Sequence, residues 1–258
     1  MNILFVGDIC GRPGRSAVKK LVPQLKAEHD IDLCIANIEN ASSGKGVTEE
    51  NYNDLLKAGI DVCTSGNHIW SKAEIIPVLE NAKELLIRPL NFPEGTPGRG
   101  VWTAEIGTTK VAVLNLMGRV FMRSGVDDPF RAVDKTLADL KDYLIIVDFH
   151  AEATSEKRAM GFYLDGRVGA VIGTHTHVPT ADAQLLPKGT AYITDVGYAG
   201  PHQSILGVDV DIIIHNFMHE PHTPHEVASG DAEFGAVVLK TTGKTVNSIE
   251  HIRRIVEL

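Results

Sequence analysis

The chain has 258 residues, which is enough for one large α/β domain with a substantial hydrophobic core. Its hydrophobic content of 43% and its charged content of 22% are ordinary for a soluble globular enzyme. The formal net charge of -8 argues against a general affinity for nucleic-acid backbone, although the local cluster of Arg12, Arg15, Lys19 and Lys20 could still meet a single phosphate.

The N-terminal residues show no basic segment followed by a long apolar run, and no apolar run approaches membrane-spanning length. The three cysteines, Cys10, Cys34 and Cys63, form no C-x-x-C pair and suit a reducing compartment. We therefore expect a cytoplasmic protein without a membrane partner. Because the sequence also lacks repeats, low-complexity tracts and linkers, residues 1–258 are expected to form a single domain.

The first half of the chain alternates between strands and helices. Apolar runs predict strands at 2–7, 32–38 and 60–65, and amphipathic patterns predict helices at 15–29, 48–58 and 72–82. Pro23 predicts either a kink in the first helix or a second short helix that starts near it. Thr48 is the expected N-cap of the second helix.

The second half changes to hairpins. We predict a hairpin from 101–106 and 110–116, a helix at 129–141, a strand at 144–149, a helix at 156–164 and a further apolar run at 171–177. Another hairpin is expected from 181–186 and 190–195, then a helix at 208–218 and two strands at 234–240 and 246–256. This change of pattern predicts a second, mixed sheet.

The run at 171–177 ends in two histidines, His175 and His177. In an extended backbone, residues i and i+2 point the same way, so both imidazoles could face one site just past the end of a strand. Two such histidines suggest metal ligands, although histidines in loops often have no function.

Ligand-type side chains also follow the other predicted strands. These residues are Asp8, Glu39, Asn40, Asn67, His68 and His150. In an open α/β sheet the carboxyl ends of the strands share one edge, where ligands bind, so we expect these residues to converge. Each has an ordinary alternative, such as a helix cap for Asp8 or a core histidine for His150, but five strand ends would then carry ligand-type residues by coincidence.

The mixture of side chains suggests the chemistry. Carboxylate, amide and imidazole groups without a cysteine pair suit two closely spaced cations such as iron, manganese or zinc. Two ions about 3.5 to 4 Å apart can activate a bridging hydroxide and clamp a phosphoryl group for in-line attack. The sequence therefore predicts the hydrolysis of phosphate esters.

The blocks Gly7-Asp8, Gly66-Asn67-His68, His150 and Thr174-His175-Thr176-His177 resemble those of calcineurin-like metallophosphoesterases. Longer strings resemble the YmdB-like branch, whose members are cyclic-nucleotide phosphodiesterases. They are Gly-Asp-Ile-Cys-Gly-Arg-Pro-Gly-Arg from Gly7, Glu39-Asn40-Ala41, Asp148-Phe-His-Ala-Glu152, the block from Gly173 to His177, and Asp195-Val196-Gly197. The resemblance covers nearly the whole chain.

This resemblance implies a layered αββα sandwich of two mixed sheets flanked by helices. It also implies a dinuclear enzyme that opens 2',3'-cyclic nucleotides to 3'-phosphonucleotides. Iron is the expected metal of both ions, with manganese or zinc as the alternatives. One ion would be held by Asp8, Glu39, Asn40 and His177, and the other by Glu39, Asn67, His150 and His175. Glu39 would bridge, and His68 would be the general acid.

One position departs from the wider superfamily, which usually places a histidine two residues after the first aspartate. Cys10 stands there in this chain, with Asn40 as the expected substitute ligand and Cys10 itself as a lesser alternative. Arg12, Lys45 and Arg119 are candidate contacts for phosphate or base. The run His219, His222 and His225 is expected to be a surface loop that forms a lid or a subunit contact.

Three alternatives stay open at this point. The same metal ligands could serve a 3',5'-cyclic-nucleotide phosphodiesterase or a broad phosphomonoesterase. A metal-containing regulatory protein that binds nucleotide and turns it over slowly is the alternative from another class. The expected partner is a small cyclic nucleotide and not a long nucleic acid, and a homo-oligomer is left open.

Overall fold

The computed structural model describes residues 1–81, 83–122 and 125–258. Its first sheet has the order β2-β11-β12-β1-β3-β4, with β13 paired to β12. The strands of this sheet are β1 (Asn2–Val6), β2 (Asp8–Ile9), β3 (Leu33–Asn37), β4 (Val62–Thr64), β11 (Tyr198–Pro201), β12 (Ala232–Thr242) and β13 (Thr245–Val256). β1, β3 and β4 are parallel neighbours, so their carboxyl ends lie at one edge.

The second sheet has the order β5-β6-β7-β8-β10-β9. Its strands are β5 (Val101–Ile106), β6 (Thr109–Met117), β7 (Leu144–His150), β8 (Ala170–Thr174), β9 (Gln184–Leu185) and β10 (Ala191–Ile193). β6, β7, β8 and β10 run parallel. The hairpins β5–β6 and β9–β10 confirm the two that the sequence predicts in this region.

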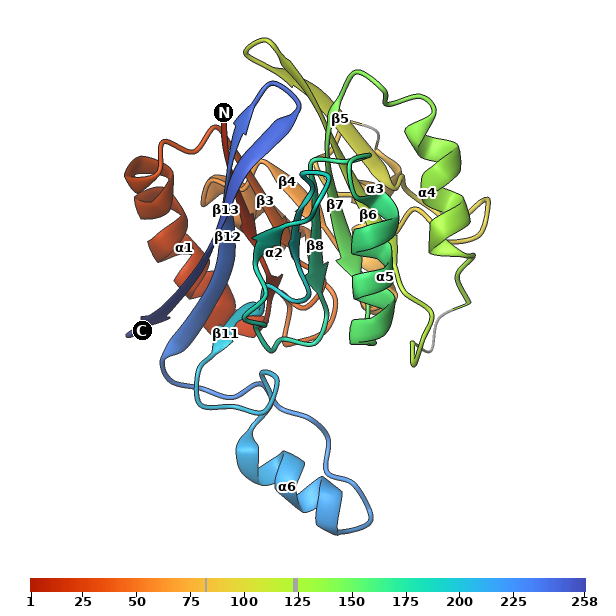
Figure 1. The fold of residues 1–258 in the computed structure, drawn as a ribbon. Coiled ribbons are helices and arrows are strands. Elements are labelled where there is room, and N and C mark those ends of the chain that lie inside the picture. Colours follow the sequence, from red (N-terminus) through yellow and green to blue (C-terminus); the bar gives the residue numbers. More distant parts are fainter. Residues whose placement is uncertain (82, 123–124) are drawn as a thin grey trace.

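Helices cover the outer face of each sheet (Figure 1). The helices among the described residues are α1 (Gly11–Glu28), α2 (Glu49–Lys57), α3 (Ile76–Glu80), α4 (Pro129–Leu137), α5 (Thr154–Leu164) and α6 (Val210–Met218), with 3-10 turns at Ile69–Ser71 and Ala73–Ile75. All of them except α6 belong to the body of the protein. α1 lies outside the first sheet, and α4 and α5 lie outside the second. The predicted αββα architecture is therefore confirmed.

Alternating side chains of the strands build three apolar layers. In β1, Ile3 and Phe5 face the space between the sheets, while Leu4 and Val6 join the layer under α1. Residues of β7 divide in the same way between the inter-sheet layer and the layer under α4 and α5. Because the strand period is two, one sequence run supplies two cores.

Three predicted helices differ in the structure. α1 begins at Gly11 and continues through Pro23, so no second helix starts there. Most of the helix predicted at 72–82 is the 3-10 turn Ala73–Ile75 and the short α3, and its predicted end at Ala82 lies outside the described residues. α4 ends at Leu137 instead of residue 141, where the chain turns through Ala138.

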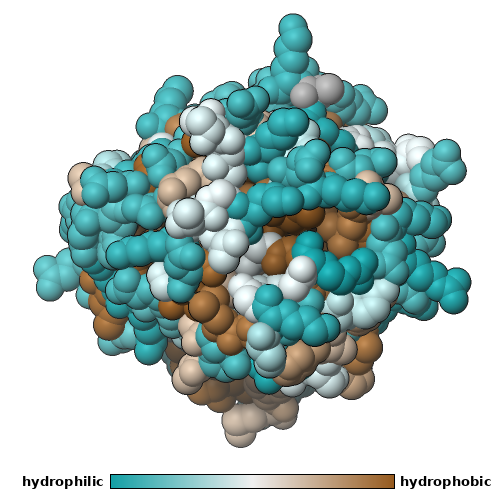
Figure 2. Space-filling view, turned by 45° about the horizontal axis from the view of Figure 1, so that its top comes forward, coloured by the Kyte–Doolittle hydropathy of each residue, from teal (hydrophilic) through white to brown (hydrophobic). Residues whose placement is uncertain are grey.

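Between β11 and β12 the chain leaves the sandwich and forms an arm, residues 206–227, that carries α6 away from the body (Figure 1). No residue of α6 is buried, although the helix contains Ile212, Ile213, Ile214, Phe217 and Met218. Among the described residues, no helix is long and apolar enough to cross a membrane. The face in Figure 2 is mostly hydrophilic, with hydrophobic residues gathered in hollows.

Candidate metal centre

The inter-sheet layer becomes polar at the carboxyl ends of the strands. Asn37 of β3, Thr64 of β4, Asp148 of β7 and Thr174 of β8 are all fully buried there. The Asp148 carboxylate accepts hydrogen bonds from Asn37 Nδ2 (3.0 Å), Thr174 Oγ1 (2.7 Å) and the Thr64 hydroxyl. We call these four residues the polar platform, because the predicted site residues lie directly beyond it.

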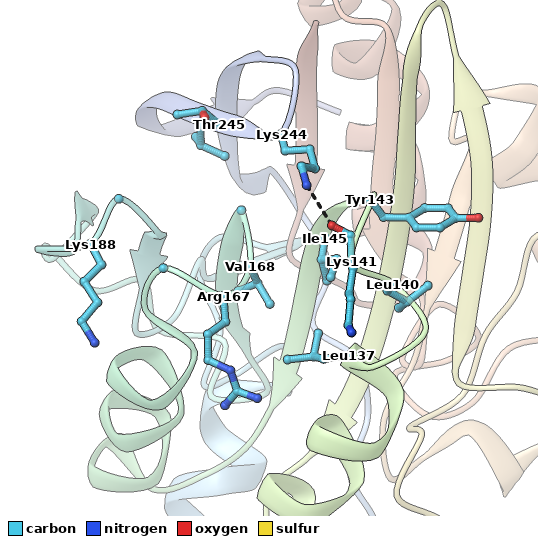
Figure 3. A pocket seen from close by; sticks show the side chains of 14 residues that line it. Leu137, Leu140, Lys141, Tyr143, Ile145, Arg167, Val168, Lys188, Lys244 and Thr245 are labelled. Carbon is cyan, nitrogen blue, oxygen red and sulfur yellow. Dashed lines mark hydrogen bonds between the residues drawn. The ribbon is translucent and has the colours of Figure 1, made fainter.

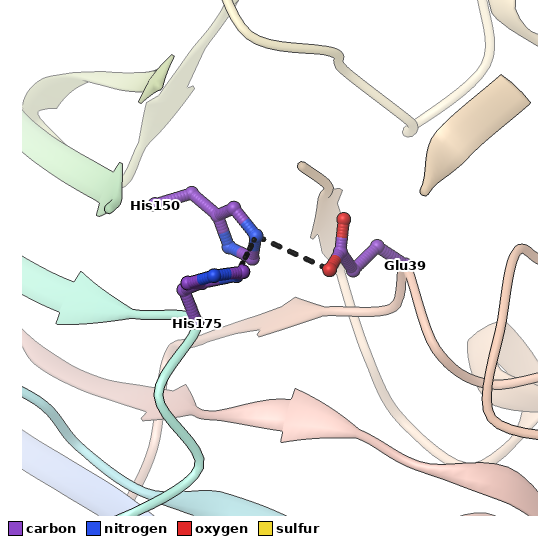
Figure 4. Close-up of side chains that lie close together, drawn as sticks. All are labelled: Glu39, His150 and His175. Carbon is purple, nitrogen blue, oxygen red and sulfur yellow. Dashed lines mark hydrogen bonds and ion pairs between the residues drawn. The ribbon is translucent and has the colours of Figure 1, made fainter. Parts of the chain in front are cut away.

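Four ligand-type atoms meet around His150, which is fully buried at the end of β7. Its Nε2 lies 3.1 Å from Glu39 Oε1, 3.1 Å from Asn67 Oδ1 and 3.0 Å from His175 Nδ1. Figure 4 shows Glu39, His150 and His175 pointing toward one another, and their ligand atoms all lie within 4.8 Å.

Hydrogen bonds on the far sides of the rings fix which nitrogen faces this cluster. His150 Nδ1 donates to Thr174 Oγ1 (3.0 Å), whose own proton goes to Asp148, so Nε2 is the His150 nitrogen that faces the cluster. His175 Nε2 lies 3.2 Å from Glu152 Oε2, which leaves Nδ1 for the cluster. Acceptors of this kind orient metal-binding histidines in proteins.

Asp8 and His177 form the other side of the site. Asp8 is fully buried; its Oδ2 accepts from the backbone N–H of His175 (3.0 Å), and its Oδ1 has no hydrogen-bond partner among the described residues. His177 Nε2 lies 3.9 Å from Asp8 Oδ1, and its Nδ1 donates to the Leu206 carbonyl (3.0 Å). An orphaned buried carboxylate oxygen beside imidazole lone pairs is a donor set that fits a cation.

Asn40 connects the two sides. Its Nδ2 faces Glu39 Oε1 (3.3 Å) and His177 Nε2 (3.2 Å), and its Oδ1 accepts from His68 Nδ1 (2.8 Å). Only the amide oxygen can bind a metal, so ligation by Asn40 would require the amide to turn over. The role of Asn40 as a ligand stays a prediction.

His68 lies at the rim, in front of Glu39. The backbone N–H of His68 donates to Glu39 Oε2 (2.9 Å), and its side chain is 29% exposed. With Nδ1 bound to Asn40, its Nε2 is the nitrogen left to exchange a proton with a ligand. This geometry suits the general acid expected from the sequence.

Charges in the site shift several pKa values. Burial lowers the pKa of His150, but the carboxylates of Glu39 and Asp8 outweigh it and raise that pKa to about 9. Burial and the charge of His150 lower the pKa of His175 to about 3. Burial raises the pKa of Asp8, whereas for Glu39 the charges of His150 and His68 outweigh burial and the pKa falls well below its usual value. The buried carboxylates of the site thus favour positive charge at His150.

Cys10 lines the same cleft, but among the described residues no hydrogen bond or ion pair joins its thiol to the ligand-type side chains. Burial and the nearby carboxylates raise the pKa of its thiol to about 12, which keeps the thiol protonated in this protein. A bound metal deprotonates a thiol that coordinates it, so the choice between Asn40 and Cys10 stays a prediction.

Two premises of the sequence argument are wrong. The strand β8 ends at Thr174, and His175 and His177 have φ angles of 98° and 61°, so they are not extended residues that point the same way. Their rings instead reach different sides of the site. The strand ends also belong to two packed sheets and not to one, with Asp8, Glu39 and Asn67 on the first and His150 and His175 on the second.

Sequence reasoning missed three supporting groups: the polar platform, Glu152, and the buried ion pair of Lys157 with Asp195. The Asp195 carboxylate accepts from Lys157 Nζ (2.6 Å) and from the N–H and hydroxyl of Thr176, between the two histidines. One signal was available in the sequence. Each platform residue occupies a position in its strand that faces the space between the sheets, and the earlier positions of that strand on the same face are apolar.

The predicted residues open onto a cleft of about 630 Å³. Glu39, Asn40, His68, His175 and His177 form its inner end, and both ends of the arm line its wall, together with the loop at 43–45. Arg119 lies outside this cleft, and Lys45 is on its rim. Another cavity of about 440 Å³ lies at the opposite ends of β7 and β8 and contains none of the predicted site residues (Figure 3).

The αββα fold is shared with a solved calcineurin-like phosphoesterase. A solved calcineurin-like phosphoesterase from Bacillus subtilis, YfkN, has the same fold, with a TM-score of 0.62 and 11% identity over 100% of this chain and 90% of that one. A family model described as YmdB-like protein matches residues 4–255. The chain belongs to the YmdB-like family.

Relatives match over nearly their whole length. A Bacillus subtilis protein named 2',3'-cyclic-nucleotide 2'-phosphodiesterase is 47% identical over 99% of this chain and 96% of its own. A crystal structure of a hypothetical protein from Thermus thermophilus has a TM-score of 0.94 and 45% identity, with 99% and 100% of the two chains covered. A solved Mycoplasma pneumoniae phosphatase also has a TM-score of 0.94, at 36% identity over 100% of this chain and 94% of that one.

Proposed function

We propose that the protein is a metal-dependent phosphodiesterase that hydrolyses 2',3'-cyclic nucleotides to 3'-phosphonucleotides. The observation that carries the proposal is the convergence of buried Glu39 with His150, His175 and Asn67 at the inner end of a cleft. The activity in the name of the Bacillus subtilis relative, at 47% identity, supports the choice of substrate.

The proposed ligand sets share Glu39. One ion is assigned to Asp8, Glu39, Asn40 and His177, and the other to Glu39, Asn67, His150 and His175. Bound cations of this kind lower the pKa of water and neutralise charge on a phosphoryl group. Iron is the first candidate, with manganese and zinc as alternatives, because the oxygen and nitrogen donors suit all three.

The protein side chains would direct the bond cleavage. Water oxygen joins phosphorus, the bond from phosphorus to the 2'-oxygen breaks, and the phosphate stays on the 3'-oxygen. His68 supplies the proton that the leaving 2'-oxygen needs, while Glu39 holds its backbone by accepting from the His68 N–H. Exposure of His68 to the cleft supports this role.

The test of the site uses Glu39→Ala and His150→Ala. Both variants are expected to lose bound metal, measured by elemental analysis of protein purified without chelator, and to lose hydrolysis of adenosine 2',3'-cyclic phosphate. Matched controls are Glu105→Ala on β5 and His222→Ala on the exposed arm, which should keep both. Undiminished activity in either site variant would refute the assignment.

His68 is tested separately from the ligands. His68→Ala should keep the metal content of the unaltered protein and lower turnover by roughly 10² to 10⁴-fold, as expected when a general acid is removed. Loss of metal from this variant would instead make His68 a ligand.

The phosphatase name of the Mycoplasma pneumoniae relative favours a phosphomonoesterase as the second candidate. Turnover of 2',3'-cyclic, 3',5'-cyclic and non-cyclic nucleotides, compared with their affinities, separates the candidates. Tight binding with negligible turnover would favour the nucleotide-binding regulatory protein. The three free, buried cysteines support the cytoplasm as the proposed compartment.

A further inference from the structure

The catalytic cleft adjoins a second cavity beside the first turn of α1. This outer cavity has a volume of about 780 Å³ and includes Arg12, Pro13 and Arg15 in its lining. Four residues line both cavities: Ser43, His225, Glu226 and Val227. The first three are exposed, so the boundary between the cavities is open to solvent and a bound chain could lie across it.

The outer cavity offers a guanidinium group to a ligand. Arg15 is half-buried and donates to the Ala41 carbonyl, which fixes it in place. Arg12 is exposed and makes no hydrogen bond or ion pair with any residue that the structure describes. A planar guanidinium that is not engaged by the protein is well suited to bind a phosphate through two hydrogen bonds.

Glu226 is the one acidic side chain among the described residues that line the outer cavity. Its carboxylate repels a phosphate. A phosphate that enters the outer cavity is therefore favoured at Arg12, beyond the boundary at Glu226.

The chemistry of the substrate selects the direction of such a chain. A 2',3'-cyclic phosphate occupies both the 2'- and 3'-oxygens of its ribose, so a longer molecule can continue only from the 5'-oxygen. With the cyclic phosphate at His68 and Glu39, the terminal nucleoside follows the cleft outward past Ser43. The next phosphodiester then enters the outer cavity.

We infer that the substrates include short oligoribonucleotides that end in a 2',3'-cyclic phosphate, with Arg12 binding the phosphodiester on the 5' side of the terminal nucleotide. The inference rests on the proposed function and adds a second phosphate position to it. The net charge of -8 and the single free guanidinium among the described residues of the outer cavity limit the chain to a few nucleotides.

The test compares two substrates of the metal-loaded protein. One is adenosine 2',3'-cyclic phosphate. The other is the dinucleotide in which the 5'-oxygen of this cyclic nucleotide is joined by a phosphodiester to the 3'-oxygen of a second adenosine. We expect a higher kcat/KM for the dinucleotide. Arg12→Ala should lower the ratio of the two kcat/KM values about tenfold, as expected when a charge-assisted contact to a phosphate is lost, and Arg12→Lys should restore part of it. Added salt should also lower this ratio.

Lys188→Ala is the matched control, because Lys188 lines the distant cavity in Figure 3 and loses one positive charge in the same way. It should leave both the ratio and the activity unchanged. Equal kcat/KM for the two substrates, or a ratio that Arg12→Ala does not change, would overturn the inference and leave the proposed function intact. Failure to hydrolyse either substrate would overturn both.

Discussion

Gly66 lies where no side chain fits. A Cβ at this position would come within 2.3 Å of the His150 ring and 2.4 Å of Glu39 Oε2. We expect Gly66→Ala to displace both residues and to weaken metal binding by roughly 10 to 100-fold, the range seen when groups that position ligands are changed. Metal titration measures the effect. Gly125→Ala, where a Cβ meets nothing within 4 Å, should bind as the unaltered protein does.

The ion pair between Lys157 and Asp195 is buried on both sides, with each residue 1% exposed. Isolated pairs of this kind contribute little net stability, but removal of one partner leaves an unpaired buried charge. Lys157→Met should therefore lower the free energy of unfolding by about 3 to 5 kcal/mol, measured by chemical denaturation. The pair holds Thr176, so we interpret it as a support for the turn that carries His175 and His177.

A double variant separates the effect of the ion pair on stability from its effect on the turn that carries His175 and His177. Lys157→Met with Asp195→Asn leaves no buried charge and should recover part of the lost stability. It should still bind metal more weakly, because the carboxylate that holds Thr176 is gone. Normal metal affinity in the double variant would show that the pair does not position the histidines.

The arm is an element whose apolar side chains add little to the body of the protein. Phe217 is 86% exposed on α6, whereas Phe5 of β1 is fully buried between the sheets. Phe217→Ser should change the free energy of unfolding by less than about 0.5 kcal/mol, as is usual for surface sites. Phe5→Ala should cost about 3 to 5 kcal/mol. Destabilisation by Phe217→Ser that depends on protein concentration would show that the arm is buried in an assembly.

Sequence patterns predicted elements wherever local signals were strong. Apolar runs followed by Asp8, Glu39 and His150 located three strands and their ends, because the apolar residues of each run and the polar residue after it differ sharply in polarity. β2 and β11 were not predicted, because each is short and their pairing joins only two residues of each strand. The helix expected at 72–82 is shorter in the structure, because Pro77 suits the first turn of α3 and not the interior of a longer helix.

The candidate site was predictable as a set of residues but not as a geometry. The local sequence identified a ligand-type residue at the end of each strand. It contains no information on which of the two sheets each strand joins. The contact of Asn40 with His68 joins the end of β3 to the 3-10 turn after β4, and the carbonyl of Leu206 reaches His177 from the arm. Such contacts depend on tertiary packing over 28 or 29 residues of sequence separation.

At the scale of the whole molecule, the proposed ligands tie the two sheets together. Glu39 follows β3 of the first sheet, and His150 ends β7 of the second. The unfolded chain does not hold Glu39 and His150 together, so a cation that binds both residues binds the folded state only. Its binding free energy therefore adds to the stability of the packed sandwich. We also propose that the chain unfolds as one unit, since its inter-sheet core takes residues from both halves of the sequence.

Thermal unfolding with and without metal tests both ideas. We expect one cooperative transition, and its midpoint should rise with manganese concentration, because a ligand at about 100 times its Kd stabilises the folded state by about 2.7 kcal/mol. Glu39→Ala should unfold in one transition that manganese no longer shifts, since the shared ligand is missing. Two separate transitions in the unaltered protein would contradict the single unit, and an equal shift in Glu39→Ala would place the stabilising ion at another site.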